Sequence, residues 1–296
     1  MDAIAPNRFL PFASMILISN RMAWQSGWLQ TEEPVMQGNV SSFLRQANLK
    51  IQSADTKEKV LDLIKTYEEA LAVDSKNREA IMGAAWYCCL IALAYASTNE
   101  EKRDFFIKAV IYCEQAMYLN PEFAGLVNKG EKVWEACRVL SKTELDALFL
   151  YYIALSSCWK DSLKGFERLL NLKWVFRAKK ALNHMMAIDP EWGGGSPYYA
   201  WANYYAAAPK FAGGDPEKAA AYYEKAIELG PEMPNFRRTR ALLLHAKNKD
   251  REALKQDLNW VLAQDPKKQR HYFTYPYCVF VQNEAREVLA NIDHYL

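Results

Sequence analysis

Residues 215–231 read DPEKAAAYYEKAIELGP, and their spacing predicts the fold of the chain. Counting back from Pro231, small or apolar residues lie at −12, −8 and −5, as Ala219, Tyr223 and Ala226. Steps of four and three residues place these side chains on one face of a helix, and a proline just beyond the helix cannot continue it. The stretch therefore predicts the second helix of a tetratricopeptide-type hairpin.

The same pattern recurs four more times, ending at Ser75, Pro121, Pro190 and Pro266. With Pro231 included, the ends are separated by 46, 69, 41 and 35 residues, whereas a regular array repeats about every 34. We therefore predict an all-α fold, a tetratricopeptide-like helical hairpin solenoid with irregular repeats and insertions. We expect residues 1–50 to form a partly irregular or helical segment and residues 51–296 a single repeat domain. The residues at −12, −8 and −5 are Leu63, Tyr67 and Ala70 in the copy that ends at Ser75, and Ala109, Cys113 and Ala116 in the copy that ends at Pro121. They are Ala178, Leu182 and Met185 in the copy that ends at Pro190, and Leu254, Leu258 and Val261 in the copy that ends at Pro266.

Hydrophobic periodicity predicts further helices around these copies. Residues 148–159 are apolar nearly all round, which is typical of a helix buried between neighbours. Asp215 is placed to cap the helix over 216–229. In the helix over 57–74, the side chains expected to face the core are Leu61, Ile64, Ala70 and Leu71. The other predicted helices span 77–96, 100–119, 163–188 as one long or broken piece, 198–205, 233–247, 251–264 and 281–292.

Composition excludes some classes of function. Lys and Arg total 37 against 35 Asp and Glu, a net charge of +2, and a nucleic-acid partner would call for a clear basic excess. The basic run Lys173–Lys180 is interpreted as a solvated helix face. No apolar run reaches the roughly 18 residues that cross a bilayer. The apolar run Phe9–Ile18 has two interpretations, a signal-peptide remnant or a first helix or loop.

No motif points to catalysis. The chain contains no phosphate-binding GxxxxGK[ST], no GxSxG nucleophile turn and no HExxH zinc helix. The four histidines lie far apart in the sequence, without cysteines or carboxylates at ligand spacing. We therefore predict a protein that is not an enzyme and holds no metal or cofactor. Cys88 and Cys113 fall on the two helices of one predicted hairpin, which allows either a disulfide or two free core thiols.

Aromatic residues are the one pattern with functional promise. The chain has 9 Trp and 17 Tyr, more than core packing between helices requires. Neighbours such as Tyr198, Tyr199 and Trp201 cannot all face one helix seam, so part of the set should line a groove or channel. The predicted ligand-binding residues are Tyr151, Tyr152, Trp159, Tyr198, Tyr199, Trp201, Tyr204 and Tyr205.

Four stretches in the second half are specific enough to compare with a known family. They are DALFL at 146–150 with the aromatic helix after it, AIDP at 187–190 with the glycines that follow, PKFAGGDPEKA at 209–219, and NEAREVL at 283–289. The third and the fourth are the most specific. Through them, residues 130–292 resemble the T-component (TatT) family of tripartite ATP-independent periplasmic (TRAP) transporters.

The resemblance implies a periplasmic, lipid-anchored, all-helical protein that assembles as a homotrimer and pairs with an extracytoplasmic solute-binding protein. It also implies a small hydrophobic or carboxylate-bearing ligand. The family's lipidated cysteine near the N-terminus has no counterpart here, because the first cysteine is Cys88. We expect a periplasmic location, with membrane association if a native N-terminus supplies such a cysteine.

Two hypotheses of function follow. In the first, the chain is a non-catalytic accessory component of a TRAP-type uptake system that binds a solute-binding protein and passes ligand through an aromatic-lined opening. In the second, it is a cytoplasmic tetratricopeptide scaffold that binds peptide segments of a protein complex. The partner-binding residues predicted for an acidic or C-terminal peptide are Arg237, Arg238 and Arg240.

Overall fold

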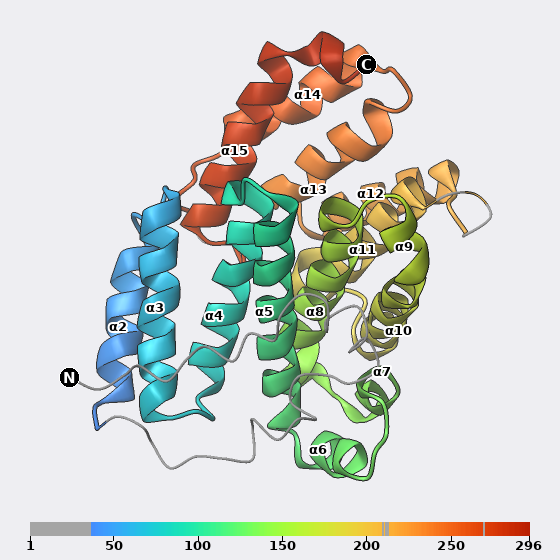
Figure 1. The fold of residues 1–296 in the computed structure, drawn as a ribbon. Helices are drawn as coiled ribbons and strands as arrows, with labels where there is room; N and C mark the ends of the chain where they lie inside the picture. The colour runs from blue at the N-terminus through green and yellow to red at the C-terminus, as the bar shows by residue number, and fades with distance from the viewer. Residues whose placement is uncertain (1–36, 209, 211–212, 269) are drawn as a thin grey trace.

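The computed structural model describes residues 37–208, 210, 213–268 and 270–296 (Figure 1). Within these residues the fold consists of 14 α-helices, and the only β-type pairing is an isolated bridge between Arg270 and Phe273. The predicted all-α solenoid is confirmed. The segment over residues 1–36, which includes the apolar run 9–18, lies outside the described residues.

Seven helices form the first half of the described chain. They are α2 (Val40–Ile51), α3 (Lys57–Val73), α4 (Arg78–Leu90), α5 (Asn99–Tyr118), α6 (Pro121–Asn128), α7 (Val133–Ala136) and α8 (Leu145–Ser157). Seven more form the second half. They are α9 (Phe166–Leu170), α10 (Leu172–Ile188), α11 (Trp192–Ala207), α12 (Pro216–Leu229), α13 (Pro234–Arg240), α14 (Arg251–Leu262) and α15 (Tyr275–Ala290).

Polar caps and prolines determine where several helices begin. The side chain of Asn77 accepts a hydrogen bond from the Ala80 N–H at 3.0 Å at the start of α4. Asp215 accepts one from the Lys218 N–H at 3.1 Å at the start of α12, which confirms the predicted cap. Pro216 occupies the first turn of α12, where no intrahelical N–H bond is needed.

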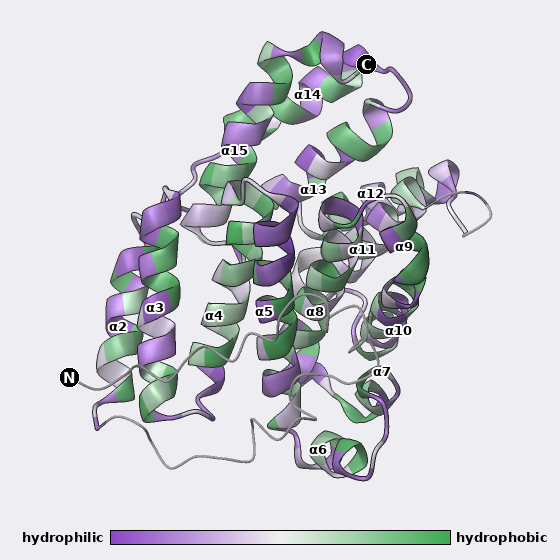
Figure 2. Ribbon diagram, in the orientation of Figure 1, coloured by the Kyte–Doolittle hydropathy of each residue, from purple (hydrophilic) through white to green (hydrophobic). Residues whose placement is uncertain are grey.

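The repeat pattern identifies the buried faces of five helices. All fifteen residues at −12, −8 and −5 are buried, each with an exposed fraction of 4 % or less. They lie on α3, α5, α10, α12 and α14. Figure 2 shows the result as hydrophobic and hydrophilic stripes along the helices. Counting back from Ser75 and the four prolines therefore gives the correct buried face of all five helices.

The helices form a curved stack in which each packs on its neighbours. Helices α2 to α5 stand side by side, and α8 packs on both α5 and α10 (Figure 1). Because α8 is enclosed in this way, its side chains are buried on nearly all sides, as predicted for residues 148–159.

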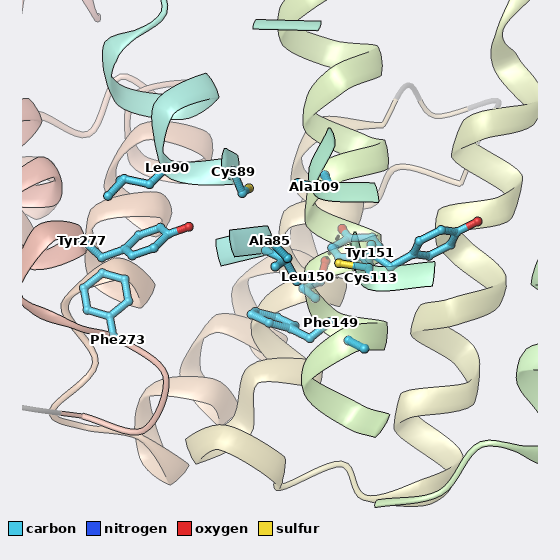
Figure 3. Close-up of a cluster of buried hydrophobic side chains, with 14 of the residues drawn as sticks. Ala85, Cys89, Leu90, Ala109, Cys113, Phe149, Leu150, Tyr151, Phe273 and Tyr277 are labelled. Atoms are coloured by element: carbon cyan, nitrogen blue, oxygen red, sulfur yellow. Dashed lines mark hydrogen bonds between the residues drawn. The ribbon is translucent and has the colours of Figure 1, made fainter. Parts of the chain in front are cut away.

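The C-terminal helices return to α4. The Tyr277 hydroxyl of α15 donates to the Trp86 carbonyl at 2.8 Å, across 191 residues of sequence. Figure 3 shows Tyr277 beside Leu90 and Cys89, with Phe273 below it. The last hairpin is thus joined to the first half of the stack by buried aromatic contacts.

One residue lies on a different face from the one predicted. Leu61 was expected on the apolar side of α3 but is 37 % exposed. The buried stripe of α3 contains Val60, Leu63, Ile64 and Tyr67. Leu61 follows Val60 by about 100° around the helix, which turns it out of this stripe.

The remaining comparisons concern helix ends. The stretch 163–188, predicted as one long or broken piece, is broken at Asn171, whose amide donates to the Glu167 carbonyl at 2.9 Å between α9 and α10. The last long helix begins at Tyr275, earlier than the predicted 281. Among the residues that the structure describes, no helix is both long and apolar enough to cross a membrane.

Candidate binding site

Tyr151 and Tyr152, both predicted to bind ligand, lie in the core. Tyr151 is fully buried, and its hydroxyl has no hydrogen-bond partner among the described residues. The Tyr152 hydroxyl donates to the Ala200 carbonyl of α11 at 2.9 Å. Both side chains pack between α8 and its neighbours α5, α10 and α11. Neither ring lines either of the two cavities described below.

Trp159 supports the segment that follows it. It lies in the π-helical turn Cys158–Ser162 after α8, and its indole N–H donates to the Arg168 carbonyl of α9 at 2.9 Å. The Arg168 guanidinium lies over the Trp159 ring, 5.6 Å from its centroid. This residue therefore holds α9 in place and does not join the other aromatic residues of the predicted set.

Four predicted residues come together on α11. Trp201 lies 5.4 Å from Tyr204 and 5.3 Å from Tyr205, measured between ring centroids. Tyr222 of α12 lies 5.4 Å from Tyr205 and 5.6 Å from Tyr198. We call Tyr198, Trp201, Tyr204, Tyr205 and Tyr222 the α11 aromatic cluster. Trp201 is buried, and the other four are half-buried, so this cluster has both a packed and an accessible side.

Tyr199 points the other way. Its ring stacks on Phe236 of α13 at 4.7 Å, and its hydroxyl lies 3.0 Å from the Thr239 hydroxyl. It is buried. Tyr198 and Tyr199 therefore face different neighbours, as expected for adjacent helical residues.

Two lysines lie over the α11 aromatic cluster. The Lys179 ammonium is 4.9 Å from the centroid of Tyr204 and 3.4 Å from its hydroxyl oxygen. The Lys218 ammonium is 5.7 Å from the centroid of Tyr205. Burial raises the pKa of Tyr205, so its hydroxyl stays neutral. Cations above aromatic faces suit a ligand with an anionic group and an apolar body.

The Gly213 turn lies beside this cluster. Gly213 has a φ of 91°, and a Cβ built on it would lie 3.6 Å from the Tyr204 hydroxyl. The Asp215 N–H donates to the Tyr205 carbonyl at 3.0 Å. The glycine thus allows the backbone just before α12 to pass close to the aromatic rings.

A second group of aromatic residues was not predicted. Tyr272 stacks between Trp86 and Trp192, at 4.9 Å and 5.6 Å with interplanar angles of 11° and 5°. A cavity of about 420 Å³ adjoins this stack. It is lined by Lys142, Thr143, Asp146, Trp192, Gly193, His271 and Tyr272. The rings come from α4, the start of α11 and the loop before α15, so no local sequence pattern could have grouped them.

A larger cavity of about 760 Å³ lies between α7 and α10. Trp134 forms part of its wall, and the Arg177 guanidinium lies 3.8 Å from the centroid of that ring. Ion pairs join Glu131 to Arg138 and Glu135 to Lys180 at its edge. The charged side chains that line this cavity thus include acidic and basic residues that pair with each other.

The three arginines predicted to bind a partner are engaged within the chain. Arg237 and Arg240 both bind Asp257, at 3.3 Å and 2.7 Å. Arg238 pairs with Glu284 of α15. These guanidinium groups join α13 to α14 and α15, and their role in binding a partner stays a prediction.

The cysteines are structural. All six are free and buried, Cys88 and Cys113 included. Burial raises the pKa of Cys88 to about 12 and that of Cys278 to about 11, which keeps both thiols protonated. In the described part of the chain, no three His, Cys, Asp or Glu side chains gather where a metal ion could be held.

One known protein family resembles most of this chain. The family model described as the TRAP transporter T-component matches residues 63–296. A comparison with curated proteins found no match. The matched region begins within α3 and runs to the C-terminus, so it includes the α11 aromatic cluster and the Trp86–Tyr272–Trp192 stack.

Proposed function

Because this chain belongs to the T-component family of TRAP transporters, we propose that it is a non-catalytic accessory component of a TRAP-type solute uptake system. In this role it binds an extracytoplasmic solute-binding protein and holds a small hydrophobic or carboxylate-bearing ligand. The family match over residues 63–296 supports the association with a transporter. A periplasmic location and a homotrimer belong to the same proposal, as the family resemblance implies.

The α11 aromatic cluster is the ligand site that we propose. The observation that carries this choice is Lys179, whose ammonium lies over Tyr204 at the half-buried side of the cluster. A carboxylate would accept a hydrogen bond from this ammonium, while an alkyl or aromatic body would lie along Trp201 and Tyr205. The rings supply apolar area, and the cation fixes the orientation of the ligand.

Calorimetric titration of the full chain tests this site, with decanoate as an anionic probe and decyltrimethylammonium as a cation of equal chain length. We expect decanoate to bind more tightly. Lys179→Gln should weaken decanoate binding about tenfold, since it removes a contact of roughly 1–2 kcal/mol. Lys180→Gln is the matched control, because Lys180 follows Lys179 but pairs with Glu135 at the larger cavity. Equal affinity of both variants would reject the site.

The scaffold hypothesis has less support from the geometry. It requires Arg237, Arg238 and Arg240 to receive an acidic peptide, yet these side chains already bind Asp257 and Glu284. A peptide would have to displace a carboxylate from a pair whose acid, Asp257, is almost fully buried. We therefore retain the transporter role as the single proposed function.

A further inference from the structure

Large apolar side chains gather on the outside of α9 and the first turns of α10. Phe166 is 72 % exposed and Phe176 is 65 % exposed. We call the group the α9–α10 patch; its members are Phe166, Leu169, Leu170, Leu172 and Phe176. Single exposed apolar residues are ordinary, but a concentration within eleven residues of sequence marks an interaction surface. Figure 2 shows hydrophobic residues, coloured green, in α9 at the edge of the stack.

The helical register shows that this patch is separate from the core. Phe166, Leu169 and Leu170 are spaced so that they share one face of α9. On α10 the buried side contains Ala178, which is 1 % exposed, two residues after the exposed Phe176. Two residues correspond to about 200° around a helix. Helix α10 is therefore apolar both toward the core and toward the outside.

The patch is held on a fixed support. The Trp159 indole N–H binds the Arg168 carbonyl, and the Arg168 Nε–H donates to the Leu163 carbonyl at 2.9 Å. The Asn171 amide closes the break between α9 and α10. These bonds fix α9 against the π-helical turn after α8, so the patch is presented as a formed surface.

Lysines flank the patch. Residues 160–176 contain four Lys or Arg and two Asp or Glu, a net charge of +2. Lys164 is exposed two residues before Phe166, and Lys173 lies between Leu172 and Phe176 in sequence. Exposed apolar side chains and a net positive charge thus occur in the same segment.

We propose that the α9–α10 patch docks this protein onto the surface of an anionic lipid bilayer. Phe and Leu side chains enter the boundary between head groups and acyl chains, and the lysines remain at the lipid phosphates. A second copy that met this patch with its own patch would bring like charges together. The proposal does not depend on the solute-binding protein or on the ligand site.

Vesicle flotation of the full chain tests the proposal, with phosphatidylcholine vesicles with or without phosphatidylglycerol. We expect binding to the anionic vesicles that weakens as salt is raised. Phe166→Ser with Phe176→Ser should reduce binding by more than about tenfold, and Lys164→Gln by about fivefold. The control is Leu49→Ser with Leu61→Ser, which removes two exposed apolar residues of α2 and α3 and should leave binding unchanged.

Thermal melting shows whether the variants fold, and we expect parental midpoints because the replaced side chains are exposed. Absence of binding by the parent chain, or equal binding by the Phe166/Phe176 variant, overturns the proposal. It is also overturned if the parent ignores vesicles but forms a multimer that this variant dissociates, because the patch would then belong to a second copy. All variants keep the same remaining sequence, so other contributions to vesicle binding cancel in the comparison.

Discussion

Tyr151 and Tyr152 are neighbours on α8, and both are buried in apolar surroundings, but their hydroxyls differ. In the part of the chain that the structure describes, the Tyr151 hydroxyl has no hydrogen-bond partner, whereas that of Tyr152 donates to the Ala200 carbonyl. Burial raises the pKa of both side chains, so both are neutral. A buried hydroxyl without a partner loses its bonds to water and gains nothing in return.

Replacement of each tyrosine by phenylalanine should therefore change stability in opposite directions. Tyr151→Phe should raise the free energy of unfolding by about 1 kcal/mol, and Tyr152→Phe should lower it by about 1 kcal/mol. Urea unfolding followed by circular dichroism measures both. Equal destabilisation by the two changes would mean that the Tyr151 hydroxyl has a partner in solution.

At the scale of elements, the repeat helices depend on small residues where they approach each other. Ala226 of α12 is fully buried, and a Cβ on Gly195 would lie 3.3 Å from its Cα. Ala226→Asp should lower the free energy of unfolding by about 4 kcal/mol, because it buries an unpaired charge in this seam. Ala221→Asp on the exposed side of the same helix should change it by less than about 0.5 kcal/mol. Similar melting temperatures for the two variants would contradict the repeat register.

Helices α13 and α14 are joined by a buried ion-pair group around Asp257. Arg240 lies 2.7 Å from its carboxylate, and the His245 ring nitrogen lies 3.4 Å away. Burial alone would raise the pKa of Asp257, but the bonds from Arg240 and His245 outweigh it and lower the pKa. A carboxyl with a lowered folded-state pKa stabilises the fold above its unfolded pKa, and this contribution is lost as pH falls through the folded value.

The pH dependence of stability should reflect this group. Asp257→Asn should lower the free energy of unfolding by about 3 kcal/mol at neutral pH, and the difference from the parent should shrink below about pH 4 as the parent carboxyl is protonated. Asp293→Asn serves as the control, because Asp293 also pairs with an arginine but is exposed. Urea titrations at several pH values measure the difference in the free energy of unfolding between the parent and Asp257→Asn. If this difference persists in acid, the ionised Asp257 carboxylate is not its source.

Local patterns in the sequence were sufficient for most of the elements. The proline-anchored count identified five buried faces, and Asp215 was recognised as a cap because capping needs only neighbouring residues. The face of Leu61 was assigned wrongly, since apolar character alone does not define the centre of a buried stripe. The position of the break at Asn171 and the start of α15 were not predicted, because hydrophobic periodicity does not locate helix ends accurately.

The candidate sites also differ in how far the sequence could predict them. Trp201, Tyr204 and Tyr205 are close in sequence, so their cluster could be anticipated from helix geometry. The stack of Trp86, Trp192 and Tyr272 joins remote segments and required the fold. The basic run in α10 was interpreted as a solvated face, because a sequence does not show which apolar faces stay uncovered beside it. For this reason the α9–α10 patch became visible only in the structure.

At the scale of the whole molecule, the return of α15 to α4 is the feature that joins the two ends of the stack. Tyr277 binds the Trp86 carbonyl, and Phe273 lies beside it in the same buried cluster (Figure 3). We propose on this basis that residues 51–296 form one domain. The α11 aromatic cluster, the stack around Tyr272 and the α9–α10 patch are then fixed relative to one another, which suits an accessory protein with several binding surfaces.

We propose that this family member works with an extracytoplasmic solute-binding protein. The most direct measurement uses the tagged full chain as bait in periplasmic extract of the source cells, with bound proteins identified by mass spectrometry and a cytosolic extract treated in parallel. We expect a solute-binding protein to be retained from the periplasmic extract. Retention of no periplasmic protein, together with a discrete cytosolic partner, would contradict it and favour the scaffold.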